Sequence, residues 1–161
     1  MKQKKIIGIT GGVGAGKSSV LAVLKNDFGA KIILADLVAH DLMEPGSLGL
    51  RKVTEALGTS FLTPDGAVDR KALADLIFRD KEALKTMNSI IHPLVWKTMK
   101  EEAEAASENL VIIEAAVFDT APKNFFDELW YVYTTKENRI VRLMENRGYS
   151  REKCEDIIGR Q

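Results

Sequence analysis

The sequence lacks the features that mark secreted, membrane-spanning and nucleic-acid-binding proteins. It has one cysteine, Cys154, so no disulfide can form within the chain, and a reducing cytoplasm is the expected location. Lys plus Arg and Asp plus Glu each number 23, so the basic excess of a nucleic-acid-binding surface is absent. No apolar run approaches the ~20 residues that span a membrane. We therefore expect neither nucleic acid nor membrane as a partner.

The rest of the composition is typical of an ordinary globular domain. The 161 residues are 45% hydrophobic and 29% charged, which suits one domain with its own core. We find no internal repeat, low-complexity segment or linker, and the sequence leaves the oligomeric state open.

Short apolar segments alternate with amphipathic segments along much of the chain, which predicts a parallel sheet in a three-layer α/β fold. We expect strands at residues 5–10, 30–34, 110–113 and 130–133. We expect helices at residues 17–28, 37–43, 48–57, 136–146 and 151–158, and from Asp69 to about residue 107 with a restart at Pro93.

Residues 8–19 read GITGGVGAGKSS and fit the phosphate-binding pattern G-x-x-x-x-G-K-[ST]. A strand is expected before this loop and a helix after it, as the P-loop requires. Backbone N–H groups of the loop and the positive end of the helix would hold phosphate oxygens. The residues expected to bind a nucleoside triphosphate are Gly11, Gly12, Val13, Gly14, Ala15, Gly16, Lys17 and Ser18.

Three side chains around this loop suit phosphoryl-transfer chemistry. Lys17 is expected to reach the β- and γ-phosphates of ATP, and the Ser18 hydroxyl to bind Mg²⁺. Glu114 closes the apolar run LVII. It is a candidate to hold Mg²⁺ through water, and a surface carboxylate at a strand end is the alternative.

The size of the chain and its motifs favour a small-molecule kinase. The N-K-x-D motif of GTPases does not occur, and Asp156–Gly159, which spells D-x-x-G, falls in an expected helix. A kinase needs an acid near the acceptor hydroxyl. Asp36 follows the second expected strand, where ligands bind in parallel α/β folds, and is a candidate to accept the hydroxyl proton. Its alternative role is to cap the next helix.

The helical block over residues 48–107 is too long for a single crossover between strands. We expect it to form an insertion beside the sheet that receives the second substrate. The nucleotide-binding core is then expected over residues 1–47 and 108–161, so that the whole chain is one P-loop kinase unit.

Several further segments resemble the dephospho-CoA kinase family. The loop is similar to that family's GLTGGIGSGKS, and Ile33–Asp36 resembles its D-A-D segment. Arg142-Leu143 followed by Arg147-Gly148 resembles its lid helix, and Gln161 falls where the family has a glutamine. Two longer blocks are also similar: GAVDRKALADLIFRD at residues 66–80 and LKTMNSIIHPLV at residues 84–95.

The resemblance implies ATP-dependent phosphorylation of the ribose 3′-hydroxyl of dephospho-CoA, the last step of coenzyme A synthesis. ATP and dephospho-CoA are then the partners, with Mg²⁺ accompanying ATP. The resemblance makes Asp36 the base, places Arg70 and His92 on the CoA side, and brings Arg142 to the ATP phosphates. The alternatives are a structural role for His92 at a helix junction and solvated surface charges for Arg70 and Arg142.

The chain also departs from the family pattern. It reads AAVFD at Ala115–Asp119 where the family has P-L-L-F-E. Asn146 replaces the second lid arginine, and Arg147 comes one residue later, ~100° around a helix, so we expect no direct role for it. The family pattern continues past Gln161 with a fifth strand. We therefore expect the family's C-terminal part to be missing and the strand at 130–133 to form an exposed edge.

Two other functions stay open from the sequence. One is a P-loop kinase for a nucleoside monophosphate or a sugar. The other is a nucleotide-binding module without catalysis. The loop supports phosphate binding in every case, whereas the identity of the acceptor depends on the resemblance.

Overall fold

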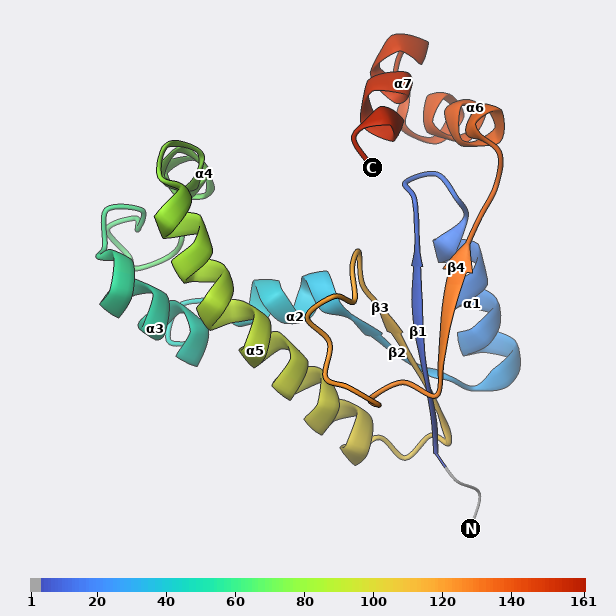
Figure 1. The fold of residues 1–161 in the computed structure, drawn as a ribbon, viewed down its shortest axis with the longest axis horizontal. Helices are drawn as coiled ribbons and strands as arrows, with labels where there is room; N and C mark the ends of the chain where they lie inside the picture. The colour runs from blue at the N-terminus through green and yellow to red at the C-terminus, as the bar shows by residue number, and fades with distance from the viewer. Residues whose placement is uncertain (1–3) are drawn as a thin grey trace. The chain divides into compact units, whose positions relative to one another are not determined.

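The computed structural model describes residues 4–161, so residues 1–3 of the predicted unit lie outside the description. Strands and helices alternate near the N-terminal end of the described residues, a run of helices follows, and two strands and then two helices complete the order (Figure 1). In chain order the elements are β1 (Lys5–Gly11), α1 (Lys17–Phe28), β2 (Lys31–Leu34), α2 (Ala35–Asp41), α3 (Leu48–Leu57), α4 (Arg70–Arg79), α5 (Lys81–Ala105), β3 (Leu110–Glu114), β4 (Glu128–Val132), α6 (Lys136–Arg147) and α7 (Arg151–Gly159).

The strands form a four-stranded sheet in the order β2-β3-β1-β4. The central strand β1 pairs in parallel with β3, where Ile7 lies opposite Ile112, and with β4, where Ile9 lies opposite Trp130. The predicted parallel α/β fold is confirmed. The predicted position of the last strand is wrong by two residues at its start, and Tyr133 lies outside it. Pairing with β1 sets the limits of β4, rather than its aromatic run.

The sheet and α1 share a core of aliphatic side chains. Ile7 of β1 and Ile112 of β3 are buried, and Leu24 of α1 packs in the same cluster. The helix ends at Gly29, whose φ of 63° and N–H bond to the Leu24 carbonyl form a left-handed cap. The loop at residues 12–16 is therefore fixed by packed elements on both sides.

The chain divides into two compact units. The first contains β1, α1, β2 up to Ile33, β3, β4, α6 and α7. The second runs from Leu34 to Ala105 and also includes residues 120–122. The segment predicted as an insertion covers residues 48–107. Its residues up to Ala105 lie in the second unit, and so does α2. Its role as an acceptor-binding insertion stays a prediction.

The long helix α5 contains Pro93 in its interior, so the predicted restart at this proline is wrong. The proline leaves the carbonyl of Ser89 without its usual N–H donor. Both residues are exposed, so water can reach that carbonyl. A buried stripe with four-residue spacing continues across the proline and keeps the helix in one piece. The stripe consists of Ile91, Val95, Met99 and Ala103.

In α2, Ala35 is the first helical residue, and the helix follows β2 without a loop. Its N-cap is Leu34, which makes no side-chain capping bond, and Asp36 lies in the first turn. The capping alternative for Asp36 is therefore wrong. Its carboxylate is exposed in the first turn of the helix.

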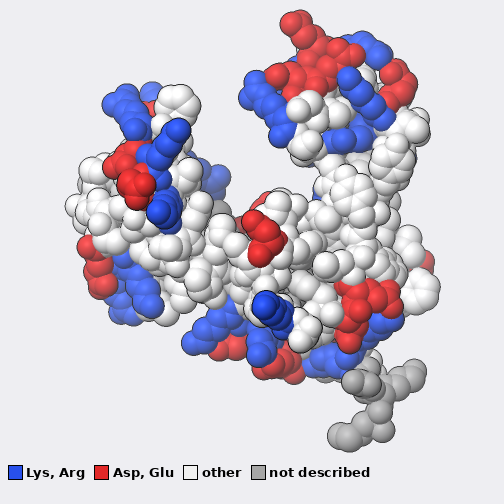
Figure 2. Space-filling model, viewed as in Figure 1, with Lys and Arg blue, Asp and Glu red and all other residues white. Residues whose placement is uncertain are grey.

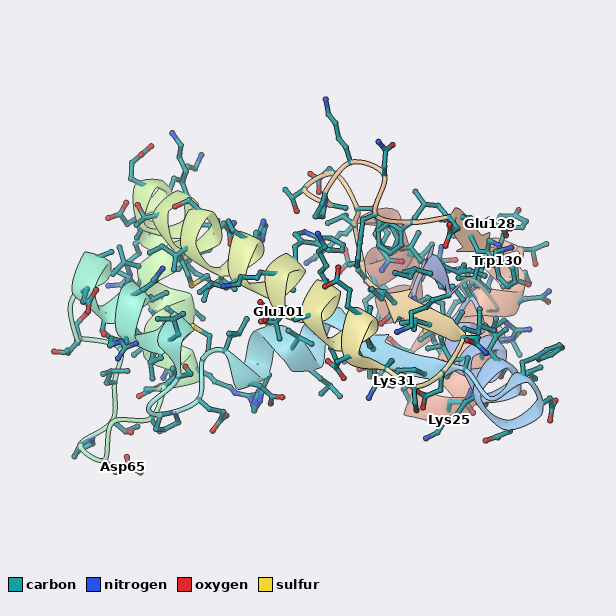
Figure 3. The ribbon with its side chains drawn as sticks, turned by 90° about the horizontal axis from the view of Figure 1, so that it is seen from below. Lys25, Lys31, Asp65, Glu101, Glu128 and Trp130 are labelled. Carbon is teal, nitrogen blue, oxygen red and sulfur yellow. The ribbon has the colours of Figure 1, made fainter. Side chains whose placement is uncertain are left out.

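Within the described residues, β4 lies at an edge of the sheet, and its Leu129 and Tyr131 are 60% and 66% exposed. Glu128 and Trp130 lie close together on this strand (Figure 3). The Glu128 carboxylate accepts hydrogen bonds from Lys5 Nζ at 2.5 Å and from Trp130 Nε1 at 2.7 Å. The bond from Lys5, more than that from Trp130, lowers the pKa of Glu128. These polar contacts help to fix the register of the edge strand.

The structure also bears on membrane insertion. Over residues 4–161, every helix is either too short or too polar to cross a lipid bilayer.

Candidate functional site

The loop between β1 and α1 adopts backbone dihedral angles that its glycines make accessible. Gly14 and Gly16 have φ values of 75° and 100°, in the left-handed region that side chains disfavour. Gly16 is also the N-cap of α1, with no side-chain cap, and no acidic residue occupies the first turn of the helix. The helix start is thus open to an anion, as the glycine spacing predicts.

Lys17 is the first residue of α1, and its side chain is folded back over the loop. Its Nζ donates hydrogen bonds to the carbonyl oxygens of Gly11 at 2.5 Å and Gly12 at 3.4 Å. The side chain is half-buried. The ammonium group is therefore held beside the loop backbone, where it can also meet a phosphate oxygen. Ser18 follows in the first turn of the helix and is exposed.

A cavity of about 780 Å³ lies over the loop. Its walls come from the loop, the start of α1, the end of β4 and one face of α6. The structure thus brings the predicted loop residues and Arg142 together, and adds Asn146 and Arg147 from the same helix. The lining residues are Gly12, Val13, Gly14, Ala15, Gly16, Lys17, Ser18, Ser19, Val20, Val132, Tyr133, Arg142, Leu143, Asn146 and Arg147.

Two arginines of α6 contact backbone carbonyls of the loop. Arg142 Nη1 donates to the Ala15 oxygen at 3.0 Å and more weakly to the Gly14 oxygen at 3.3 Å. Arg139 Nε donates to the Val13 oxygen at 2.7 Å. Arg139 was absent from the residues predicted from the sequence. Its signal is the spacing of three residues from Arg142, which places both side chains on one face of a helix.

An ion pair fastens α6 to α7, and Figure 2 shows charged groups of both signs over these helices. The Glu137 carboxylate accepts bonds from two nitrogens of Arg151 at 2.9 and 2.8 Å. These hydrogen bonds lower the pKa of Glu137 and raise that of Arg151. The pair is exposed, so it orients the helices more than it stabilises them.

Glu114 is the last residue of β3 and lies opposite Ile9 of β1 in the register. Just beyond it, the Ala116 carbonyl accepts a bond from Thr10 Oγ1 at 3.0 Å. Glu114 therefore ends its strand beside the residues that lead into the loop. Within residues 4–161, no cluster of three or more His, Cys, Asp or Glu side chains is arranged to hold a metal ion. A magnesium ion on a nucleotide needs only one or two protein ligands, and the roles of Ser18 and of Glu114, through water, in holding it stay predictions.

The other predicted residues belong to the second unit. Asp36 lies in the first turn of α2, and Arg70 is the exposed first residue of α4. His92 is half-buried in α5, so it lies inside a helix and not at a helix junction. It lines a mostly apolar cavity of about 590 Å³. The cavity is lined by Asn88, Ser89, His92, Pro93, Trp96, Lys97, Lys100, Thr120 and Pro122.

Comparison with known proteins tests the resemblance carried by these residues. A family model described as dephospho-CoA kinase matches residues 5–161. The chain belongs to the dephospho-CoA kinase family. Dephospho-CoA kinase from Carboxydothermus hydrogenoformans is 36% identical over 153 residues, covering 92% of this chain and 74% of the relative. The enzyme of that name from Moorella thermoacetica is 38% identical over 161 residues, covering 97% and 76%.

Solved structures share the fold of this chain. A crystal structure of a Thermus thermophilus protein has a TM-score of 0.76 and 30% identity, covering 99% of this chain and 81% of that chain. Dephospho-CoA kinase from Campylobacter jejuni has a TM-score of 0.61 and 23% identity, covering 97% and 79%. The second likeness supports the fold, which is that of P-loop kinases.

Proposed function

We propose that this chain transfers the γ-phosphoryl group of ATP to the ribose 3′-hydroxyl of dephospho-CoA, giving ADP and CoA. The observation that carries the phosphate donor is the loop itself, and membership of the family carries the acceptor. The open helix start of the loop, the inward Lys17, and Arg142 and Arg147 of α6 surround one cavity of about 780 Å³ in a member of this kinase family. Such a cavity is large enough for a nucleotide.

In the proposed reaction, the bond between the γ-phosphorus and the β,γ-bridging oxygen breaks, and a bond from the 3′-oxygen to that phosphorus forms. Lys17 and Arg142 offset the negative charge on the phosphate oxygens. Ser18, with Glu114 acting through water, would hold Mg²⁺, which supplies further charge neutralisation. Asp36 accepts the proton that leaves the 3′-hydroxyl.

We assign the acceptor to the second unit. Arg70 is an exposed cation at the start of α4, suited to the pyrophosphate of dephospho-CoA. His92 lines the mostly apolar cavity beside Trp96, whose indole N–H is satisfied by Thr120 Oγ1 at 3.0 Å. An apolar wall with polar groups at its margin suits an amphipathic ligand.

An acceptor panel tests the proposal. The purified chain is incubated with Mg²⁺, ATP and, in turn, dephospho-CoA, a nucleoside monophosphate and a sugar, and ADP and phosphorylated product are measured. We expect turnover with dephospho-CoA and none with the same protein carrying Lys17→Ala. Turnover of another acceptor alone would replace the substrate assignment. ATP binding without transfer to any acceptor would indicate a nucleotide-binding module.

A further inference from the structure

One residue of the phosphate loop, Val13, is held on three sides by α6, α7 and the segment that follows them. Its N–H donates to Gln161 Oε1 at 2.9 Å, and its carbonyl accepts the bond of 2.7 Å from Arg139 Nε. Its side chain packs against a buried cluster. The cluster consists of Ile140, Leu143, Cys154 and Ile158.

Arg139 and Gln161 are also bonded to each other. Arg139 Nη2 donates to the same Gln161 oxygen that accepts the Val13 N–H. The guanidinium group thus forms a fork, with one nitrogen on the loop and another on the glutamine. The fork lies over Gly12, where a Cβ atom would come within 2.4 Å of Arg139 Nη2. Glycine at this position leaves the room that the fork occupies.

The planarity of the peptide bond gives these contacts a consequence for phosphate binding. The Val13 carbonyl and the Gly14 N–H belong to one peptide plane and point in opposite directions. When Arg139 draws the carbonyl toward α6, the Gly14 N–H turns the other way. Arg142 acts on the next two carbonyls in the same manner. Arg139 does not line the described cavity, so it acts on the loop from behind.

We propose that Arg139 and Gln161 are positioning residues that hold the Val13 peptide, and with it the loop N–H groups, in the orientation that receives nucleotide phosphates. This inference rests on the proposed function, because it assumes that the loop binds a nucleotide. It predicts that nucleotide affinity depends on the fork geometry of residue 139 and not only on its charge.

The test measures ADP binding to the whole chain by calorimetry, together with the melting temperature. Arg139→Gln and Arg139→Lys are both expected to weaken ADP binding by roughly 10- to 100-fold, because a lysine keeps the charge but cannot contact Val13 and Gln161 in parallel. The matched control is Arg151→Gln, which removes an arginine of α7 that pairs with Glu137 and not with the loop. The control is expected to keep wild-type affinity.

A second variant closes the test. Gln161→Ala is expected to weaken ADP binding, and its effect combined with Arg139→Gln is expected to be smaller than the sum of the two. Wild-type affinity in Arg139→Gln, full rescue by Arg139→Lys, or an equal loss in Arg151→Gln would each overturn the inference. A wild-type chain that binds no ADP would instead overturn the proposed function, so the two failures are separable.

Discussion

The phosphate loop and the acceptor-side residues differ in how far their polar groups are already paired. In the loop, Lys17 bonds to two carbonyls, Val13 is bonded at both its N–H and its C=O, and Arg142 caps two further carbonyls. The side chains of Asp36, Arg70 and His92, by contrast, make no hydrogen bond or ion pair with any other residue in the described range 4–161. One region is ordered by the protein itself, and the other offers unpaired groups.

The difference follows from what each region has to recognise. Every nucleoside triphosphate presents the same phosphate oxygens, so a loop of backbone N–H groups can be fixed in advance. In the proposed function, the acceptor is recognised by individual side chains on separate helices. Unpaired side chains lose little when the ligand arrives, because they have no internal partner to give up. Substitutions at the loop should therefore act on catalysis and on nucleotide affinity. Substitutions in the second unit should leave nucleotide affinity unchanged and act on the acceptor, through its proton at Asp36 and its binding at Arg70.

The largest effect is expected for Lys17→Ala. Removing the ammonium group should reduce the rate of ADP formation below detection, because charge on the transferred phosphoryl group loses a preorganised donor. The matched control is Lys25→Ala, near the other end of α1. Near-normal turnover in Lys17→Ala would show that the lysine takes no part in the reaction. The phosphate loop would then not be the region on which catalysis depends most.

Asp36→Asn should slow transfer by roughly 10²–10⁴-fold while the Kd for ATP stays near the wild-type value. The amide keeps the size of the side chain but cannot take the hydroxyl proton. Since Asp36 is not the N-cap of α2, loss of a cap cannot account for the change. Asp41→Asn, at the end of the same helix, is the control. Full activity in Asp36→Asn would exclude Asp36 as the base.

Arg70→Ala should raise the KM for dephospho-CoA by roughly tenfold with kcat little changed, as expected when a charge contact made equally in the ground and transition states is lost. Lys71→Ala removes a charge from the adjacent position of α4 and serves as the control. Steady-state kinetics at saturating ATP separate the two constants. A fall in kcat alone would place Arg70 in the chemical step. The second unit would then not differ from the phosphate loop in the way proposed for this residue.

The smallest effect is expected for Glu137→Gln, which breaks the exposed pair with Arg151. The hydrogen bonds from Arg151 lower the folded-state pKa of Glu137 below its ordinary value of 4.5. The pair therefore stabilises the fold above about pH 4.5, and this contribution is lost as the pH falls through the lowered pKa. We expect a slightly lower melting temperature for the variant at pH 7 and a smaller difference in acid. A difference that grows in acid would contradict this assignment.

The sequence predicted most where a backbone pattern determines the structure. The glycine spacing predicted the loop, and the apolar period gave both ends of α1 and of α3. The restart predicted at Pro93 was wrong because the local propensity of proline favours a break in a helix, whereas packing of the buried stripe of α5 outweighs that propensity. Arg139 escaped notice because its partners, Val13 and Gln161, lie 126 and 22 residues away. Contacts of that range depend on the tertiary fold, so the spacing from Arg142 can indicate a shared helix face but not these two partners.

The buried thiol of Cys154 gives this chain a built-in reporter. It is fully buried in the cluster that also receives Val13 of the loop, and the chain contains no second cysteine. A thiol reagent can reach Cys154 only when α6 and α7 separate, so the rate of modification measures how often that local opening occurs. Bound nucleotide that tightens the loop on these helices should slow the modification. The rate at which the Cys154 thiol is modified can thus report how often the helices behind the phosphate loop open.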